Sequence, residues 1–223
     1  MGSKNDKKIK VTENGPYEIT GNIPLDQLGF VPDNHGNSLK YKKIDSYPIE
    51  DVYHLCRCGQ SECKPFCDGT HQVVNFDGKE TASYTDYEKK GKVIKGKDID
   101  LIDAEELCAG ARFCDTHGST WHLVSKGTTQ EEKDIAIQQC ANCPSGRLTP
   151  VDKNGNKIEP NLPKEISILE DPAAEVHGPI WVKGGITIED ENGKLYPDRN
   201  RVTLCRCGKS TNKPFCDGNH VRE

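Results

Sequence analysis

The stretch Cys56-Arg-Cys-Gly-Gln-Ser-Glu-Cys-Lys-Pro-Phe-Cys-Asp-Gly-Thr-His71 occurs a second time as Cys205-Arg-Cys-Gly-Lys-Ser-Thr-Asn-Lys-Pro-Phe-Cys-Asp-Gly-Asn-His220, with twelve of sixteen positions identical. Both copies share one spacing of sulfur and imidazole side chains: C-x-C, eight residues, C, three residues and H. Cysteine and histidine are common metal ligands, and chance does not preserve such a spacing twice in one short chain. Each copy is therefore predicted to hold a metal centre.

The spacing within each copy favours a centre with two metal atoms. The two thiolates of a C-x-C pair can both reach one atom. If the following Cys-Asp-Gly-x-His segment is a helical turn, its cysteine and histidine lie at i and i+4, within reach of a second atom. Zinc sites usually present two short clips a dozen or more residues apart, whereas these ligands span sixteen residues. The pattern favours a two-iron core, with tetrahedral zinc as the alternative.

Both copies also fit C-x-C-x2-S-x3-P-x-C-D-G-x-H, which resembles the CDGSH iron–sulfur domain of the NEET family. The resemblance implies a [2Fe–2S] cluster in each copy and two units packed across a pseudo-two-fold axis within one chain. Thr70 and Asn219 replace the name-giving serine, which is not a ligand in that family. The implied ligands are Cys56, Cys58, Cys67 and His71 in the first copy, and Cys205, Cys207, Cys216 and His220 in the second.

Four further cysteines lie between the copies. Cys108-x2-Ala111-x2-Cys114, followed later by Cys143-Pro144, resembles the divergent single-cluster ferredoxins, with alanine at the second ligand position. A missing second cysteine in that group commonly goes with [3Fe–4S], whereas Cys140 as a fourth ligand would complete [4Fe–4S]. The C-x2-C pair at 140–143 also permits zinc, held with Cys108 and Cys114. We predict a third, iron–sulfur centre here.

The predicted fold class is α+β and mostly small β. It has two pseudo-symmetric β-rich modules packed together and a small ferredoxin-like α+β insert. The predicted division of the chain is 1–13 flexible arm, 14–76 first module, 77–152 ferredoxin-like cluster domain, and 153–223 linker and second module. Each module is expected to begin with a small hairpin, at Gly15 to Leu25 and at Gly178 to Ile188. Residues 30–43 are interpreted as a polar loop insertion.

In the middle region a strand is expected around Ile99 and Leu101, and a second around Trp121 to Val124. Thr129-Gln-Glu-Glu132 is a capping-box signature that predicts a helix to about Gln139. The sequence then predicts strands at 148–151 and at 166–169.

Composition narrows the function classes. Only 33% of the 223 residues are hydrophobic, so bound metal is expected to supply folding free energy that apolar burial does not. The net charge of −5 argues against nucleic acid as a partner. Eleven cysteines without a signal peptide or a long apolar run indicate a reducing, cytoplasmic location without membrane insertion. We expect a monomer.

The sequence carries no phosphate loop, no dinucleotide fingerprint and no nucleophile beside a base, so we expect a protein that is not an enzyme. The first hypothesis is one-electron transfer with a redox protein or reductase as partner. The second is a cluster donor to apo iron–sulfur proteins, or a redox sensor. The third is a structural zinc protein that serves as an interaction scaffold. Because a histidine ligand makes the site less negative than four thiolates and can be protonated, potential and cluster stability should both depend on pH.

Overall fold

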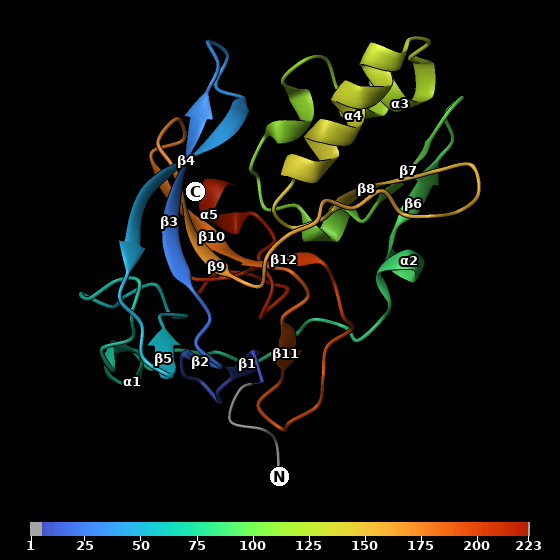
Figure 1. Cartoon of the computed structure of the whole chain (residues 1–223). Helices are drawn as coiled ribbons and strands as arrows, with labels where there is room; N and C mark the ends of the chain where they lie inside the picture. The colour runs from blue at the N-terminus through green and yellow to red at the C-terminus, as the bar shows by residue number, and fades with distance from the viewer. Residues whose placement is uncertain (1–5, 223) are drawn as a thin grey trace.

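The computed structural model describes residues 6–222, and the chain is α+β with three small sheets (Figure 1). The first sheet has the strand order β11-β1-β2-β5. In it β1 pairs in parallel with β11 and antiparallel with β2, and β2 pairs antiparallel with β5. The bounds are β1 Lys8–Val11, β2 Tyr17–Thr20, β5 Val52–Leu55 and β11 Thr187–Glu189.

The second sheet has the order β12-β10-β9-β3-β4, in which β3 and β9 pair in parallel and the other neighbours pair antiparallel. Within the residues that the structure describes, it holds the longest strands. Their bounds are β3 Leu25–Pro32, β4 Ser38–Tyr47, β9 Ile166–Asp171, β10 Val176–Lys183 and β12 Arg201–Leu204.

The two sheets repeat one arrangement and exchange strands. Tyr17 faces Leu55 across β2 and β5, and the corresponding Ile180 faces Leu204 across β10 and β12. After β2 the chain turns at Gly21 and enters the other sheet as β3, and after β10 it enters the first sheet as β11. The predicted hairpins are therefore wrong: each pair of strands exists, but its members lie in different sheets. Both sheets share one apolar core, which includes Ile9, Ile19, Leu25, Ile166, Val182 and Ile188.

Two further expectations need correction. The flexible arm predicted at residues 1–13 is wrong where the structure describes it, since residues 1–5 lie outside the described part. Lys8–Val11 is a strand inside the first sheet, because Ile9 and Val11 alternate with lysines and are fully buried. Residues 30–43 are not a loop insertion: they belong to the β3–β4 hairpin. Its Phe30 and Tyr41 pack on Phe113 and Trp181.

The middle region forms the third sheet, in the order β6-β7-β8, with two helices against it. The strands at 99–101, 148–151 and 166–169 are confirmed, as is the capping box of α4, whose helix runs on to Asn142. The strand expected at Trp121 is wrong, since Ser119 caps a helix there by accepting a hydrogen bond from the His122 backbone N–H. The bounds are β6 Lys92–Ile94, β7 Asp100–Asp103, β8 Leu148–Val151, α2 Tyr87–Lys90, α3 Thr120–Lys126 and α4 Gln130–Asn142.

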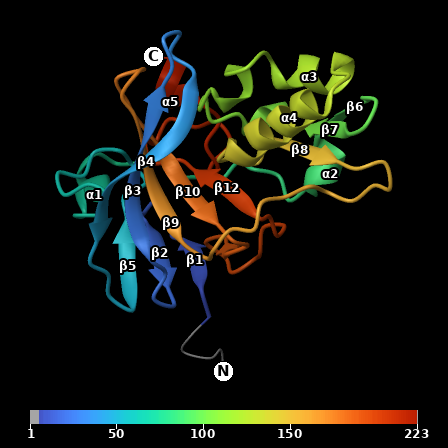
Figure 2. The same cartoon turned by 45° about the horizontal axis from the view of Figure 1, so that its top comes forward.

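The middle region sits beside one repeat. Figures 1 and 2 both show α3 and α4 on the side of β12 and away from α1 (Thr70–Val73), which follows the first cysteine segment. Residues 77–86, expected in the middle domain, instead reach the second repeat. Tyr84 stacks on Tyr196 at 4.7 Å between ring centroids, and the backbone N–H groups of Thr81 and Ala82 bond to Lys213. Among the described residues no helix is long and apolar enough to span a bilayer.

Candidate metal centres

Each cysteine segment is fixed to the end of a strand. Cys56 follows β5, and its backbone N–H donates to the Pro65 carbonyl at 2.8 Å, while Cys67 N–H donates to the His54 carbonyl at 2.9 Å. In the second segment Cys205 donates to Pro214 and Cys216 donates to Thr203 at the same 2.8 Å. This ladder folds the C-x-C pair back toward the third cysteine.

The four predicted ligands of each copy lie as two pairs. In the first copy the Cys56 and Cys58 sulfurs are 3.7 Å apart, and Cys67 Sγ lies 3.3 Å from His71 Nδ1. In the second copy the Cys205–Cys207 and Cys216–His220 separations are 3.6 and 3.5 Å. Among the described residues, no three His, Cys, Asp or Glu side chains gather where one metal ion would be held. The arrangement of the donors as one Cys–Cys pair and one Cys–His pair in each copy fits a binuclear core, with one pair for each metal atom.

The third cysteine reaches its histidine without the helical turn considered from the sequence. The helix α1 begins at Thr70, after Gly69 at φ +89°, so that Cys67 precedes it. Asp68 closes this bend, because its carboxylate accepts the backbone N–H of Thr70 at 3.0 Å and that of Glu62 at 2.7 Å. These bonds lower the pKa of Asp68. Asp217 has the same role before α5 (Asn219–Arg222).

The arginine within each C-x-C pair is buried, but its guanidinium group has different partners in the two copies. Arg206 donates to the Glu170 carboxylate at 2.7 Å and to the Gly178 and Leu169 carbonyls. Arg57 donates to the carbonyls of Thr12 and Gly78, and among the described residues it makes no ion pair within 4 Å, although its charge interacts with the Glu80 carboxylate. The second site thus lies beside a direct arginine–carboxylate ion pair, whereas the first lies beside an arginine without one.

Burial also differs between the copies. Cys67 is half-buried, whereas its counterpart Cys216 is 3% exposed. Burial, together with the Arg206 charge, lowers the pKa of His220 to about 4. Burial raises the pKa of the Cys216 thiol, and the nearby Cys205 and Cys108 groups add to the rise. In the second copy the cysteine that precedes the histidine is therefore the more enclosed, and the middle region contributes to its surroundings, whereas in the C-x-C pair Cys58 is buried and Cys207 is half-buried.

Sequence reasoning missed several supporting residues. The hydroxyl groups of Ser61 and Ser210 each donate at 2.7 Å to the carbonyl of the phenylalanine five residues later. The sequence does mark this residue, because serine stands at the same position in both copies. Tyr17 is fully buried, and its hydroxyl lies 2.7 Å from the Cys205 carbonyl in the other copy. No sequence signal marked Tyr17, because the matching residue is Ile180.

In the middle region three of the four predicted cysteines surround one cavity. Cys108, Cys114 and Cys143 line it, and so does Ala111, which replaces the second ligand of the ferredoxin pattern. Arg147 borders the same cavity and bonds to Asp103 at 2.6 Å. The donor set fits a cluster bound by three thiolates, with an uncharged methyl group where a fourth ligand would stand.

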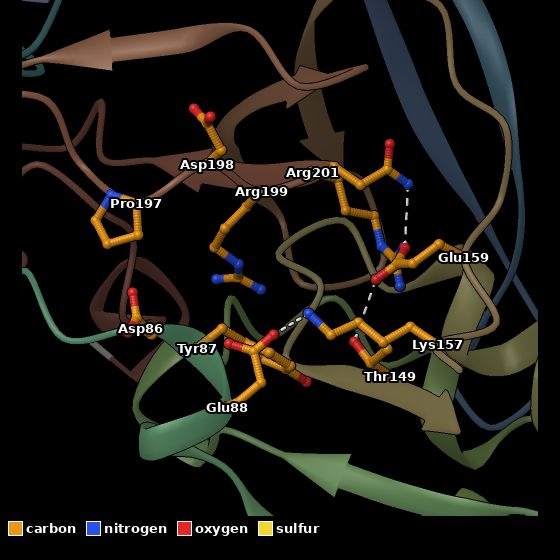
Figure 3. A pocket seen from close by; sticks show the side chains of 11 residues that line it. Asp86, Tyr87, Glu88, Thr149, Lys157, Glu159, Pro197, Asp198, Arg199 and Arg201 are labelled. Carbon is orange, nitrogen blue, oxygen red and sulfur yellow. Dashed lines mark hydrogen bonds and ion pairs between the residues drawn. The ribbon is translucent and has the colours of Figure 1, made fainter. Parts of the chain in front are cut away.

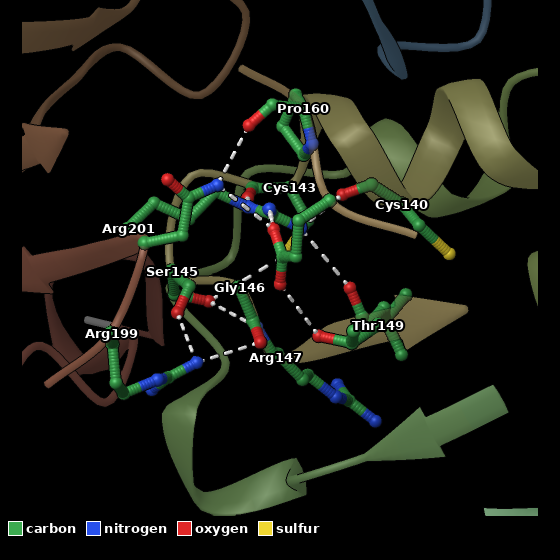
Figure 4. Close-up of polar contacts among 12 residues, drawn as sticks. Cys140, Cys143, Ser145, Gly146, Arg147, Thr149, Pro160, Arg199 and Arg201 are labelled. Carbon is green, nitrogen blue, oxygen red and sulfur yellow. Dashed lines mark hydrogen bonds and ion pairs between the residues drawn. The ribbon is translucent and has the colours of Figure 1, made fainter. Parts of the chain in front are cut away.

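Cys140 is placed elsewhere. It is 0% exposed and packs in the apolar core of the middle region with Ala136 and Leu148, and it is not among the residues that line the cavity. Burial raises the pKa of its thiol well above the usual value. Its backbone carbonyl accepts a hydrogen bond from Arg201 at 2.9 Å (Figure 4).

Comparison with known families agrees with this division. The family described as iron-binding zinc finger, CDGSH type, matches residues 14–72 and 177–221, and the family described as divergent 4Fe-4S mono-cluster matches residues 94–153. No curated protein and no solved structure gave a significant match. The chain is thus an iron–sulfur protein of the CDGSH family, a tandem-motif member with an inserted divergent 4Fe-4S mono-cluster domain.

Proposed function

We propose that the protein is a one-electron carrier with two [2Fe–2S] clusters and one [3Fe–4S] cluster. The observation that carries this proposal is the paired ligand geometry, which occurs in both copies with sulfur–sulfur separations of 3.7 and 3.6 Å. The [3Fe–4S] assignment is supported by the three cysteines and the alanine around the middle cavity. When bound, such clusters accept and release single electrons.

The residues of the chain adjust those centres. Each imidazole replaces a thiolate and leaves its site one unit less negative, which favours reduction. Buried arginines and backbone N–H groups, such as Gly218 N–H at 3.5 Å from the Cys216 sulfur, add favourable interactions with negative charge. We further propose that the two copies form pseudo-symmetric modules in a monomer, and that the insert is ferredoxin-like.

The proposed partner is a redox protein or reductase in a reducing, cytoplasmic setting, and no catalytic role is proposed. The test is anaerobic mixing of reduced protein with an oxidised one-electron acceptor such as cytochrome c, followed by iron analysis of both proteins after separation. We expect oxidation of this protein with its iron retained. Movement of iron to an added apo-ferredoxin at the same rate would support cluster donation instead. A colourless protein that contains zinc would contradict both.

A further inference from the structure

The inserted domain packs against the ligand loop of the second CDGSH site at Gly218, whereas the equivalent position in the first site, Gly69, is open. Gly218 and Gly69 are the equivalent glycines of the two Cys-Asp-Gly segments, at φ +82° and +89°. A Cβ at Gly218 would lie 2.8 Å from the carbonyl oxygen of Cys108, a ligand of the middle site. A Cβ at Gly69 would meet no atom within 4 Å. The same backbone is thus packed against the middle site in the second copy and open in the first.

A second contact joins the middle region to the second CDGSH segment. Gly110, two residues after Cys108, lies so near α5 that a Cβ there would be 2.9 Å from a methyl group of Val221. Val221 directly follows the ligand His220. The loops that carry ligands of the middle site and of the second CDGSH site are therefore in direct contact.

Arginines of the second module hold the other ligand loop of the middle site. Arg201 donates to the Cys143 carbonyl at 2.9 Å, and Arg199 donates to the Ser145 and Gly146 carbonyls at 3.1 and 2.8 Å (Figure 4). Arg199 also lies over the Tyr87 ring, 4.5 Å from its centroid, beside a cavity of about 280 Å³ (Figure 3).

The first module has no counterpart of these two arginines. By the alignment of the two cysteine segments, Arg199 and Arg201 correspond to Glu50 and Val52. Val52 is 45% exposed, whereas Arg201 is 1% exposed. The two arginines that hold the Cys143 loop are thus present in only one of the two repeats, although the first module also contacts the insert, where the Tyr41 hydroxyl donates to the Asn142 carbonyl at 2.7 Å.

The two CDGSH loops in turn contact each other. A Cβ at Gly59 would lie 2.8 Å from the Cys207 carbonyl oxygen, and one at Gly208 would lie 2.7 Å from that of Cys58. The contacts between ligand loops therefore run from the first site to the second and from the second to the middle site. This spatial order differs from the order of the segments in the sequence.

We propose that Gly218 and Gly110 are positioning residues that hold the middle site against the second CDGSH site, which makes the second site the junction between the other two. The inference rests on the proposed electron-carrier function. One electron from a protein donor reduces the site at either end, and its onward transfer reoxidises that site and reduces the neighbour, while no covalent bond forms or breaks. Exchange between the first and middle sites then depends on the second.

The test is microwave power saturation measured by electron paramagnetic resonance. At a potential where neighbouring centres are both paramagnetic, their spins interact, and the microwave power that half-saturates each electron paramagnetic resonance signal rises. In the parent we expect a raised half-saturation power for the middle centre. Cys207→Ala, which removes a ligand of the second site, should lower it severalfold. Cys58→Ala, which disables the first site, should leave it unchanged.

Substitution of the two equivalent glycines gives a matched pair of variants in which every proposed ligand is retained. Gly218→Ala and Gly69→Ala introduce the same backbone strain at positive φ, but only the first adds a clash with Cys108. We expect Gly218→Ala alone to lower the half-saturation power of the middle centre. Equal effects of the two variants, an effect of Cys58→Ala as large as that of Cys207→Ala, or a middle site without a signal would overturn the inference. Absence of every cluster signal would instead overturn the proposed function.

Discussion

Replacement of Cys140 and of Cys143 by alanine distinguishes a core cysteine from the proposed ligand three residues away. Cys140 is fully buried beside Ala136 and Leu148, so Cys140→Ala removes one buried sulfur and leaves a small cavity. Loss of that packing should cost about 1–2 kcal/mol of unfolding free energy. For a chain of this size the melting temperature should fall by about 2–8 °C. The iron content should not change.

Cys143→Ala, in contrast, should lower the iron content, because Cys143 lines the cavity of the middle site. The parent should contain roughly seven iron atoms per chain, and Cys143→Ala should lose about three of them together with the signal of the middle centre. The assay is iron and acid-labile sulfide per chain on anaerobically purified protein, with electron paramagnetic resonance of the oxidised form. Equal loss of the middle iron from both variants would refute our assignment of Cys140 to the core.

Three further outcomes are expected. Tyr17→Phe should cost about 1–3 kcal/mol in denaturant unfolding, because the buried Cys205 carbonyl loses its partner; an unchanged midpoint would contradict that role. Glu170→Gln should raise the reduction potential of the second site toward that of the first, because Arg206 loses its counter-ion; potentiometry that finds no shift would argue against electrostatic control by this pair. Replacement of His71 or His220 by cysteine should lower the potential and slow cluster loss in acid; variants that match the parent in both would exclude the histidines as ligands.

The sequence predicted the two CDGSH segments well because their information is local. Sixteen residues contain the ligands, the bend and the supporting serine, and the structure brings each predicted cysteine close to its partner. The capping box at Thr129 is local in the same way, and α4 begins there. In these cases neighbouring residues decide the conformation.

The sequence predicted less where distant segments decide. The apolar alternation after Gly15 and Gly178 correctly indicated strands, but no local feature showed that each would enter the other sheet. The run from Trp121 to Val124 favours a strand by composition, yet the Ser119 cap and packing on α4 stabilise a helix. The contact between Gly218 and Cys108 joins positions 110 residues apart, and nothing near either residue predicts it.

The most direct test of the account is pulsed electron paramagnetic resonance of the reduced protein, read for nitrogen bound to a [2Fe–2S] centre. We predict a reduced [2Fe–2S] signal with strong nitrogen coupling. About half of the coupled signal should remain when either His71 or His220 is replaced by cysteine, and the coupling should disappear when both are replaced. A parent protein without a [2Fe–2S] signal, or with one that shows no coupling to a bound nitrogen, would contradict the claim that three thiolates and one imidazole hold each core.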